Sequence, residues 1–100
     1  MDDTLSIELY RKEGKTLQTG SLSVYLNGTV RIDSWDLGEL PEQWWGHDEY
    51  EFGVTVSGTD IRKLVFALLR DRYTGRTGAV GEFRDFCEKE GIETHSFHSF

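Results

Sequence analysis

The sequence predicts an α+β domain in which an antiparallel sheet of about five strands has two helices packed on one face. Three observations lead to this prediction. Apolar and polar residues alternate in four segments of the first 57 residues, which is typical of half-buried strands. Apolar residues then recur at helical spacing between positions 60 and 90. The length of 100 residues suits one core, so we expect a single α+β domain over 1–100.

Four strands are expected before the helices and one after them. The alternating segments are 5–10, 22–26, 30–33 and 49–57, with a turn at Glu13-Gly14-Lys15 between the first two. The tail 93–100, rich in Thr, Ser and Phe, is expected to form the last strand. Strand 49–57 has the clearest pattern, with Tyr50, Phe52, Val54 and Val56 on one face.

Parity decides how the second and third strands pair around Asn27-Gly28. Residues that pair across an antiparallel ladder share a face, so a two-residue turn would set each apolar face against a polar one. A loop of odd length, with Gly28 left-handed in a G1-type bulge, avoids this mismatch. The pairs that we expect are Val24 with Val30 and Leu22 with Ile32.

Two helices are expected after the fourth strand. The first runs from Asp60 to Tyr73 and follows hydroxyl residues that suit an N-cap. A glycine-rich break at 74–78 precedes a second helix, whose apolar stripe includes Cys87. Gly91 is expected to end it as the left-handed residue of a Schellman motif, with Ile92 against the last turn.

Periodicity disappears over residues 34–48, which predicts a loop of roughly fifteen residues, a length that is more often functional or locally packed than incidental. All three tryptophans lie in it, and aromatic side chains beside charged groups favour contacts with another protein. The alternative is that some of them cap an open end of the sheet, Trp35 more readily than the pair. The expected partner-binding residues are Trp44, Trp45, His47, Asp48, Glu49 and Glu51.

Composition and charge narrow the classes of function. The formal net charge is −7, which repels polyanions on average. Residues 60–84 hold six basic and three acidic side chains, a net charge of +3, so the remainder carries −10. No signal-peptide pattern and no stretch apolar enough for a membrane helix is present. The lone Cys87 suits a compartment that keeps thiols reduced, so we expect a cytoplasmic protein.

Catalytic and metal-binding patterns are absent from the sequence. Cys87 lies on the buried stripe of its helix, where a thiol is an inert hydrophobe. His95 and His98 would face opposite sides of a strand and could not chelate one ion. Glu49 and Glu51 share the polar face of a strand, but nothing completes an acid–base site. We expect neither an enzyme nor a cofactor nor a metal.

Gly75-Arg76-Thr77-Gly78 is a Gly-x-x-Gly loop with a basic second residue, between two helices that are flanked by strands. This order resembles the core of KH domains, in which the loop clamps the backbone of a single-stranded nucleic acid. The resemblance implies nucleic-acid binding by Gly75, Arg76, Thr77, Gly78 and Arg72, which lie in the basic stretch 60–84.

The last half of the chain also resembles small uncharacterised bacterial proteins, and this resemblance implies no activity. The residues that it rests on are Glu49-Tyr50-Glu51 in a strand, Phe83-Arg84-Asp85-Phe86, Gly91-Ile92 at a turn and the aromatic tail 97–100.

We therefore expect a small, acidic, non-catalytic bacterial protein that acts by binding another protein, for example as an immunity or adaptor protein. An acidic surface beside tryptophans suits a basic partner. The alternative is a KH-like module that binds single-stranded nucleic acid with the loop 75–78. A final strand at a sheet edge could pair with its copy, so both a monomer and a homodimer stay open.

Overall fold

A computed structural model describes residues 3–39, 41, 43, 46 and 49–99. The chain divides into two compact units, Met1–Leu64 and Val65–Phe100, which we describe one at a time. The predicted class is confirmed, because the described residues form an antiparallel sheet and include the α-helices α2 and α3. The packing of the helices on the sheet and the single domain stay predictions.

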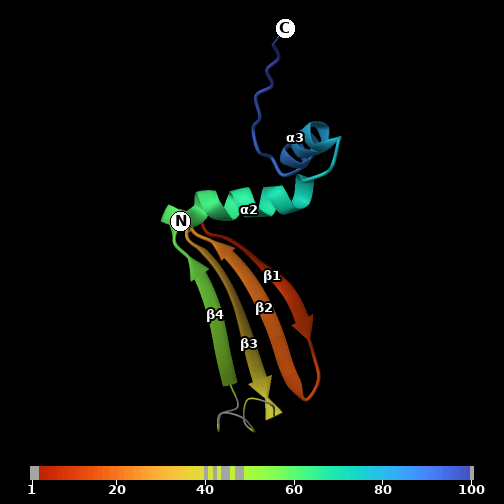
Figure 1. Cartoon of the computed structure of the whole chain (residues 1–100). Helices are drawn as coiled ribbons and strands as arrows, with labels where there is room; N and C mark the ends of the chain where they lie inside the picture. The colour runs from red at the N-terminus through yellow and green to blue at the C-terminus, as the bar shows by residue number, and fades with distance from the viewer. Residues whose placement is uncertain (1–2, 40, 42, 44–45, 47–48, 100) are drawn as a thin grey trace. The chain divides into compact units, whose positions relative to one another are not determined.

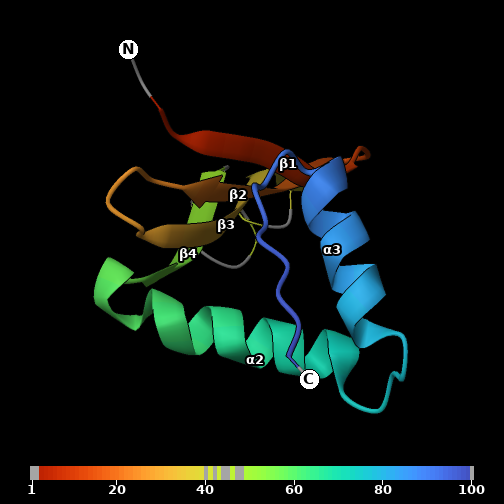
Figure 2. The same ribbon diagram turned by 90° about the horizontal axis from the view of Figure 1, so that it is seen from above.

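The first unit is built on a meander of four strands, which lie side by side in chain order in Figure 1 and Figure 2. Each neighbouring pair is antiparallel. The strands are β1 (Leu5–Lys12), β2 (Thr16–Val24), β3 (Val30–Gly38) and β4 (Glu49–Val56).

The β2–β3 hairpin has the odd register that the sequence predicts. Leu22 lies opposite Ile32, and Val24 lies opposite Val30. These four aliphatic residues therefore share one face of the sheet, as the parity of an antiparallel ladder requires.

A three-residue loop, 26–28, closes this hairpin. The backbone N–H of Tyr25 donates to the carbonyl of Thr29 at 2.8 Å, and the N–H of Gly28 donates to the carbonyl of Tyr25 at 2.8 Å. Gly28 has a φ of +88°, the left-handed conformation of a G1 bulge. The Asn27 side chain also accepts a hydrogen bond from the N–H of Thr29 at 3.0 Å, which holds the turn.

The β1–β2 pair contains a bulge between Glu8 and Tyr10. Beyond it Tyr10 lies opposite Gly20, and a Cβ on Gly20 would overlap the Tyr10 ring. The ring therefore covers the backbone of the neighbouring strand, and a side chain at position 20 would have to displace it.

Strands β2 and β3 are longer than the sequence pattern predicts. β2 begins at Thr16, and β3 continues to Gly38, so residues 34–38 are strand rather than loop. The two extensions pair with each other, from Thr16 opposite Gly38 to Gly20 opposite Ser34. In β3 the apolar side chains change face, because Val30 and Ile32 lie on one side and Trp35 and Leu37 lie on the other. The sequence therefore shows no single alternation, but the backbone ladder does not depend on one.

The predicted fifth strand is wrong, because the described part of the tail, 93–99, forms no strand. A strand exists only where a neighbouring strand pairs with its backbone. The apolar and polar residues of the tail alternate only weakly, so the tail has no apolar face that would pack it beside another strand. In the described part of the chain the sheet therefore has four strands.

The helices agree with the predicted ranges. A short 3-10 turn, Gly58–Asp60, leads into α2 (Ile61–Tyr73), and a glycine-containing loop separates α2 from α3 (Ala79–Lys89). The Ser57 side chain caps the 3-10 turn by accepting a hydrogen bond from the N–H of Thr59 at 3.3 Å.

The predicted Schellman motif ends α3. Gly91 has a φ of +72°, and its N–H donates to the carbonyl of Glu88 at 3.1 Å. The N–H of Ile92 donates to the carbonyl of Cys87 at 2.8 Å, which completes the motif. Cys87 itself is buried, as its place on the apolar stripe predicts.

Gly28→Ala tests the hairpin loop. A Cβ in the left-handed region is strained, so the substitution should lower the free energy of unfolding by about 1–2 kcal/mol. Gly28→Asn is the matched control, because asparagine tolerates this conformation and should cost less. Chemical denaturation of the three proteins measures the difference. An equal cost for alanine and asparagine would contradict a left-handed loop position.

Candidate functional site

The partner-binding residues predicted from the sequence divide into two groups. Trp44, Trp45, His47 and Asp48 lie outside the described residues. Glu49 and Glu51 lie on β4, on the polar face of the sheet.

Both described glutamates have partners within the sheet. The Trp35 indole N–H donates to Oε1 of Glu49 at 2.7 Å. Arg31 donates to Oε1 of Glu51 at 2.6 Å, and Arg31 also lies 3.2 Å from a carboxylate oxygen of Asp33. Exposed ion pairs of this kind add little stability, about 0–1 kcal/mol, but they fix the direction of the side chains. Each glutamate therefore binds a side chain of β3, and the two carboxylates do not form a shared ligand site.

The Gly-x-x-Gly loop lies between α2 and α3, as predicted, and Gly75 is left-handed with a φ of +81°. Its basic residue, Arg76, forms a bidentate pair with Glu82 of α3. Arg76 Nε lies 2.7 Å from one carboxylate oxygen, and Nη2 lies 2.7 Å from the other. The guanidinium that the KH resemblance assigns to nucleic acid thus already binds a carboxylate of the same chain.

This ion pair shifts the pKa of both groups. The hydrogen bonds from Arg76 hold the pKa of the Glu82 carboxyl below its ordinary value of 4.5, and the positive charges of Arg76 and Arg72 lower it further. In turn, the hydrogen bond and the negative charge of Glu82 raise the pKa of Arg76.

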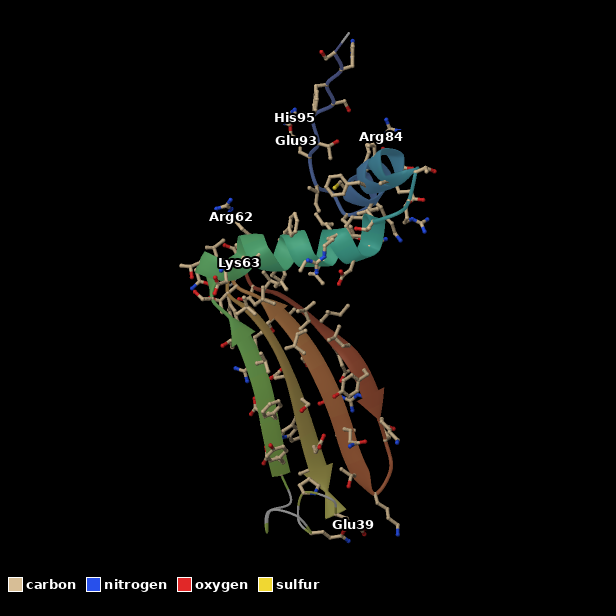
Figure 3. All side chains as sticks on the ribbon, in the orientation of Figure 1. Glu39, Arg62, Lys63, Arg84, Glu93 and His95 are labelled. Carbon is tan, nitrogen blue, oxygen red and sulfur yellow. The ribbon has the colours of Figure 1, made fainter. Side chains whose placement is uncertain are left out.

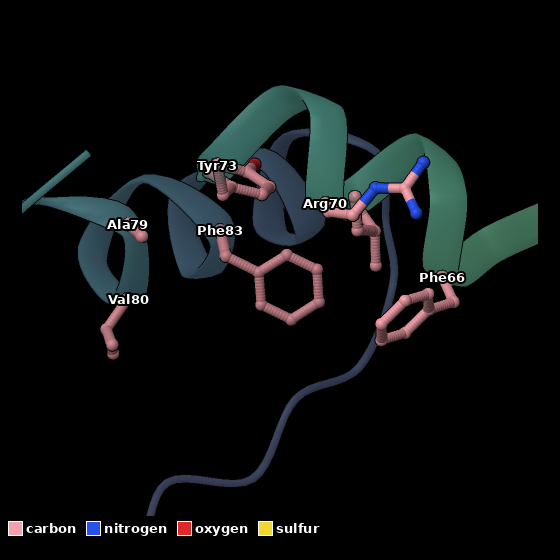
Figure 4. Close-up of a pocket in the computed structure, with 7 residues that line it drawn as sticks. Phe66, Arg70, Tyr73, Ala79, Val80 and Phe83 are labelled. Atoms are coloured by element: carbon pink, nitrogen blue, oxygen red, sulfur yellow. The ribbon is translucent and has the colours of Figure 1, made fainter. Parts of the chain in front are cut away.

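An apolar groove lies within the second unit, between α2 and α3 (Figure 4). It has a volume of about 500 Å³. Where the two helices meet, the rings of Tyr73 and Phe83 pack edge to face, with centroids 5.9 Å apart and planes at 86°. The groove is lined by Phe66, Leu69, Arg70, Tyr73, Ala79, Val80 and Phe83.

Arg70 lines this groove, whereas Arg72 on the same helix lies outside the lining. The Arg70 guanidinium lies 6.0 Å from the centre of the Phe66 ring, and that of Arg72 lies 4.7 Å from the centre of the Phe86 ring. Both are at cation–π distance, so each side chain lies over an aromatic ring while its charge stays near water. Arg70 is therefore the charged residue of the groove lining, and its Nε lies 3.3 Å from a carboxylate oxygen of Asp71.

Sequence reasoning missed this groove, although the signal for it was present. One apolar stripe of α2 consists of Ile61, Leu64, Val65 and Leu68. Phe66, Leu69 and Tyr73 form a second stripe at spacings of three and four. Residues 65–69 are apolar on every side of the helix, and such a helix is covered on every side in a functional protein.

The described residues contain neither a cluster of metal-binding side chains nor a membrane-spanning helix. No three His, Cys, Asp or Glu side chains of the described ranges are grouped so that they could hold a metal ion. His95 lies 3.7 Å from Glu93 on the tail, and both side chains are exposed (Figure 3). No helix in this part of the chain is long and apolar enough to cross a membrane.

Comparison with protein-family models, with curated proteins and with solved structures finds no match to this chain.

Titration of Glu82 tests the Arg76 pair. By NMR, the pKa of the Glu82 carboxyl should lie below 4.5, and Arg76→Gln should raise it toward that value. Because the folded-state pKa is lowered, the contribution of the pair to stability is complete above the ordinary pKa and is lost as pH falls through the lowered one. Arg84→Gln is the control and should leave the Glu82 pKa unchanged. A Glu82 pKa that is indifferent to Arg76→Gln would exclude the pair.

Proposed function

We propose that the protein is a non-catalytic interaction protein that binds another protein through the groove between α2 and α3. The observation that carries this proposal is the exposure of large apolar side chains along the groove. Val80 is 86% exposed and Phe66 is 68% exposed. Exposed apolar surface that is gathered in one concave place is typical of a binding site, whereas scattered exposure is ordinary.

The energetics favour a protein as the occupant. Burying one Val, Leu or Phe side chain contributes about 1.5–3 kcal/mol, so covering several of them supplies enough free energy for specific association. The aromatic residues Phe66, Tyr73 and Phe83 are of the type that dominates binding energy at the centre of interfaces.

The shape and charge of the groove favour one kind of partner segment. An apolar groove between two helices suits an amphipathic helix, whose apolar side chains recur at spacings of three and four. Arg70 in the lining of the groove favours an acidic residue beside that apolar stripe. We therefore propose a partner helix with an apolar face flanked by glutamate or aspartate.

Fewer observations support the two functions expected from the sequence, a tryptophan-segment interface and a KH-like module. A basic partner at the tryptophan segment stays a prediction, because most of its residues lie outside the described ones. The KH-like alternative is supported by the Gly-x-x-Gly loop between two helices, but Arg76 is held by Glu82 and no strand follows α3 in the described residues.

A designed peptide tests the proposal. The probe is a fluorescent amphipathic helix of about 15 residues with a leucine stripe and flanking glutamates, and the matched control peptide carries lysines instead. The glutamate peptide should bind at least about tenfold more tightly, which corresponds to about 1.4 kcal/mol. Val80→Asp should abolish binding in fluorescence anisotropy. Aspartate suits the first turn of α3, so this variant should keep the helix.

Phe97→Asp is the control variant, because Phe97 is almost fully exposed but lies outside the groove. It should bind the peptide as the unmodified chain does. Equal binding of both peptides, or binding that survives Val80→Asp, would refute the proposed site. A single-stranded oligonucleotide as a third probe separates the alternatives, since binding of the oligonucleotide alone would favour the KH-like function.

A further inference from the structure

A second pocket of the unit Val65–Phe100 adjoins the groove and has a different character. Its volume is about 330 Å³, and it is lined by Arg72, Tyr73, Arg76 and Glu82. The first two residues belong to the last turn of α2, the third to the loop that follows, and the fourth to α3. Tyr73 lines both this pocket and the groove. We call the second pocket the arginine pocket.

The arginine pocket already contains one oxyanion, the carboxylate of Glu82. Arg76 binds it with two hydrogen bonds of 2.7 Å. The hydrogen bonds and charge of Arg76 lower the pKa of the Glu82 carboxyl, and the charge of Arg72 lowers it further, so both guanidinium groups favour an anion here. The Arg76 and Glu82 side chains are 57% and 42% exposed, and exposed ion pairs add little stability. An anion of higher charge can therefore replace Glu82.

Two residues of the pocket have donors that no described residue uses. Arg72 forms no ion pair with the described residues, and its guanidinium lies 4.7 Å from the centre of the Phe86 ring and 5.7 Å from that of Tyr73. The two rings hold it beside the pocket. The Tyr73 hydroxyl oxygen is buried and has no hydrogen-bond partner among the described residues. Buried hydroxyls almost always have a partner, so one without any marks a place where a ligand can bond.

We propose that Arg72, Tyr73 and Arg76 bind a phosphate monoester, which displaces Glu82 from Arg76. A monoester offers three terminal oxygens and about 1.5–2 negative charges at pH 7, so each of the three residues can donate to one oxygen. A carboxylate or a phosphodiester offers two such oxygens and one charge, and neither has this advantage over Glu82. The Tyr73 hydroxyl reaches the ligand once the side chains that cover it move apart. This site differs from a KH-like clamp, which holds diesters.

Methyl phosphate is the probe, and isothermal titration calorimetry of the full chain measures its binding. We expect a dissociation constant of about 1 mM or less. Arg72→Gln should raise this constant at least about tenfold, because a guanidinium that binds the phosphate is lost. Arg84→Gln is the matched control, since it removes the same charge from an exposed position of α3 outside the pocket, and it should bind as the unmodified chain does.

Two further variants separate ligand binding from a structural role. Glu82→Gln removes the competing carboxylate and should lower the dissociation constant at least about tenfold, whereas Glu88→Gln, outside the pocket, should leave it unchanged. Tyr73→Phe should weaken binding without lowering the free energy of unfolding, because the hydroxyl has no partner in the free protein.

Three results would overturn the inference. The first is no binding of about 10 mM methyl phosphate by either the unmodified chain or Glu82→Gln. The second is an equal effect of Arg72→Gln and Arg84→Gln, and the third is equally tight binding of dimethyl phosphate, a diester. Circular dichroism establishes that each variant is folded, and Glu82→Gln decides the question if Arg72→Gln is not.

A short phosphoserine peptide distinguishes the sources of the phosphate. Tighter binding of this peptide than of methyl phosphate would assign the monoester to a protein, and weaker binding would assign it to a small molecule. Either result supports the site. Methyl phosphate is too small and polar to fill the groove, so its binding is independent of the proposed partner helix.

Discussion

The odd-length loop between β2 and β3 is the constraint on which the rest of the sheet depends. A shift of one residue in an antiparallel register moves every side chain of a strand to the other face. Because residues 26–28 form a three-residue loop with Gly28 left-handed, Val24 meets Val30 and Leu22 meets Ile32. β1 and β4 then add their aliphatic residues to the same face. The separation of an apolar from a polar face follows from this one loop.

The fold could be predicted from the sequence wherever local chemistry decides the structure. The register around Gly28 and the Schellman motif at Gly91 depend on parity and on left-handed glycine, which the sequence displays. The extension of β3 through residues 34–38 was not predicted, because Trp35 and Leu37 lie on the opposite face from Val30 and Ile32 and break the single alternation. The tail 93–99 was misjudged for the opposite reason, since strand-forming residues without a neighbouring strand form no ladder.

The candidate sites were less predictable, since they depend on contacts between distant residues. The sequence singles out Glu49 and Glu51, but their partners Trp35 and Arg31 come from β3 and follow only from the β3–β4 register. The groove was within reach of sequence reasoning, because a helix that is apolar on every side needs cover on every side.

Deletion of Leu26 tests the hairpin register most directly. Leu26 is 82% exposed, so its loss removes no packing. The deletion leaves the two-residue loop Asn27-Gly28, a favoured type I′ turn, and keeps Val24 opposite Val30. The free energy of unfolding in chemical denaturation should then stay within about 1 kcal/mol of the unmodified value. If the hairpin instead used a two-residue turn from the start, the deletion would reverse the parity of β2, and a loss of cooperative unfolding would contradict the account.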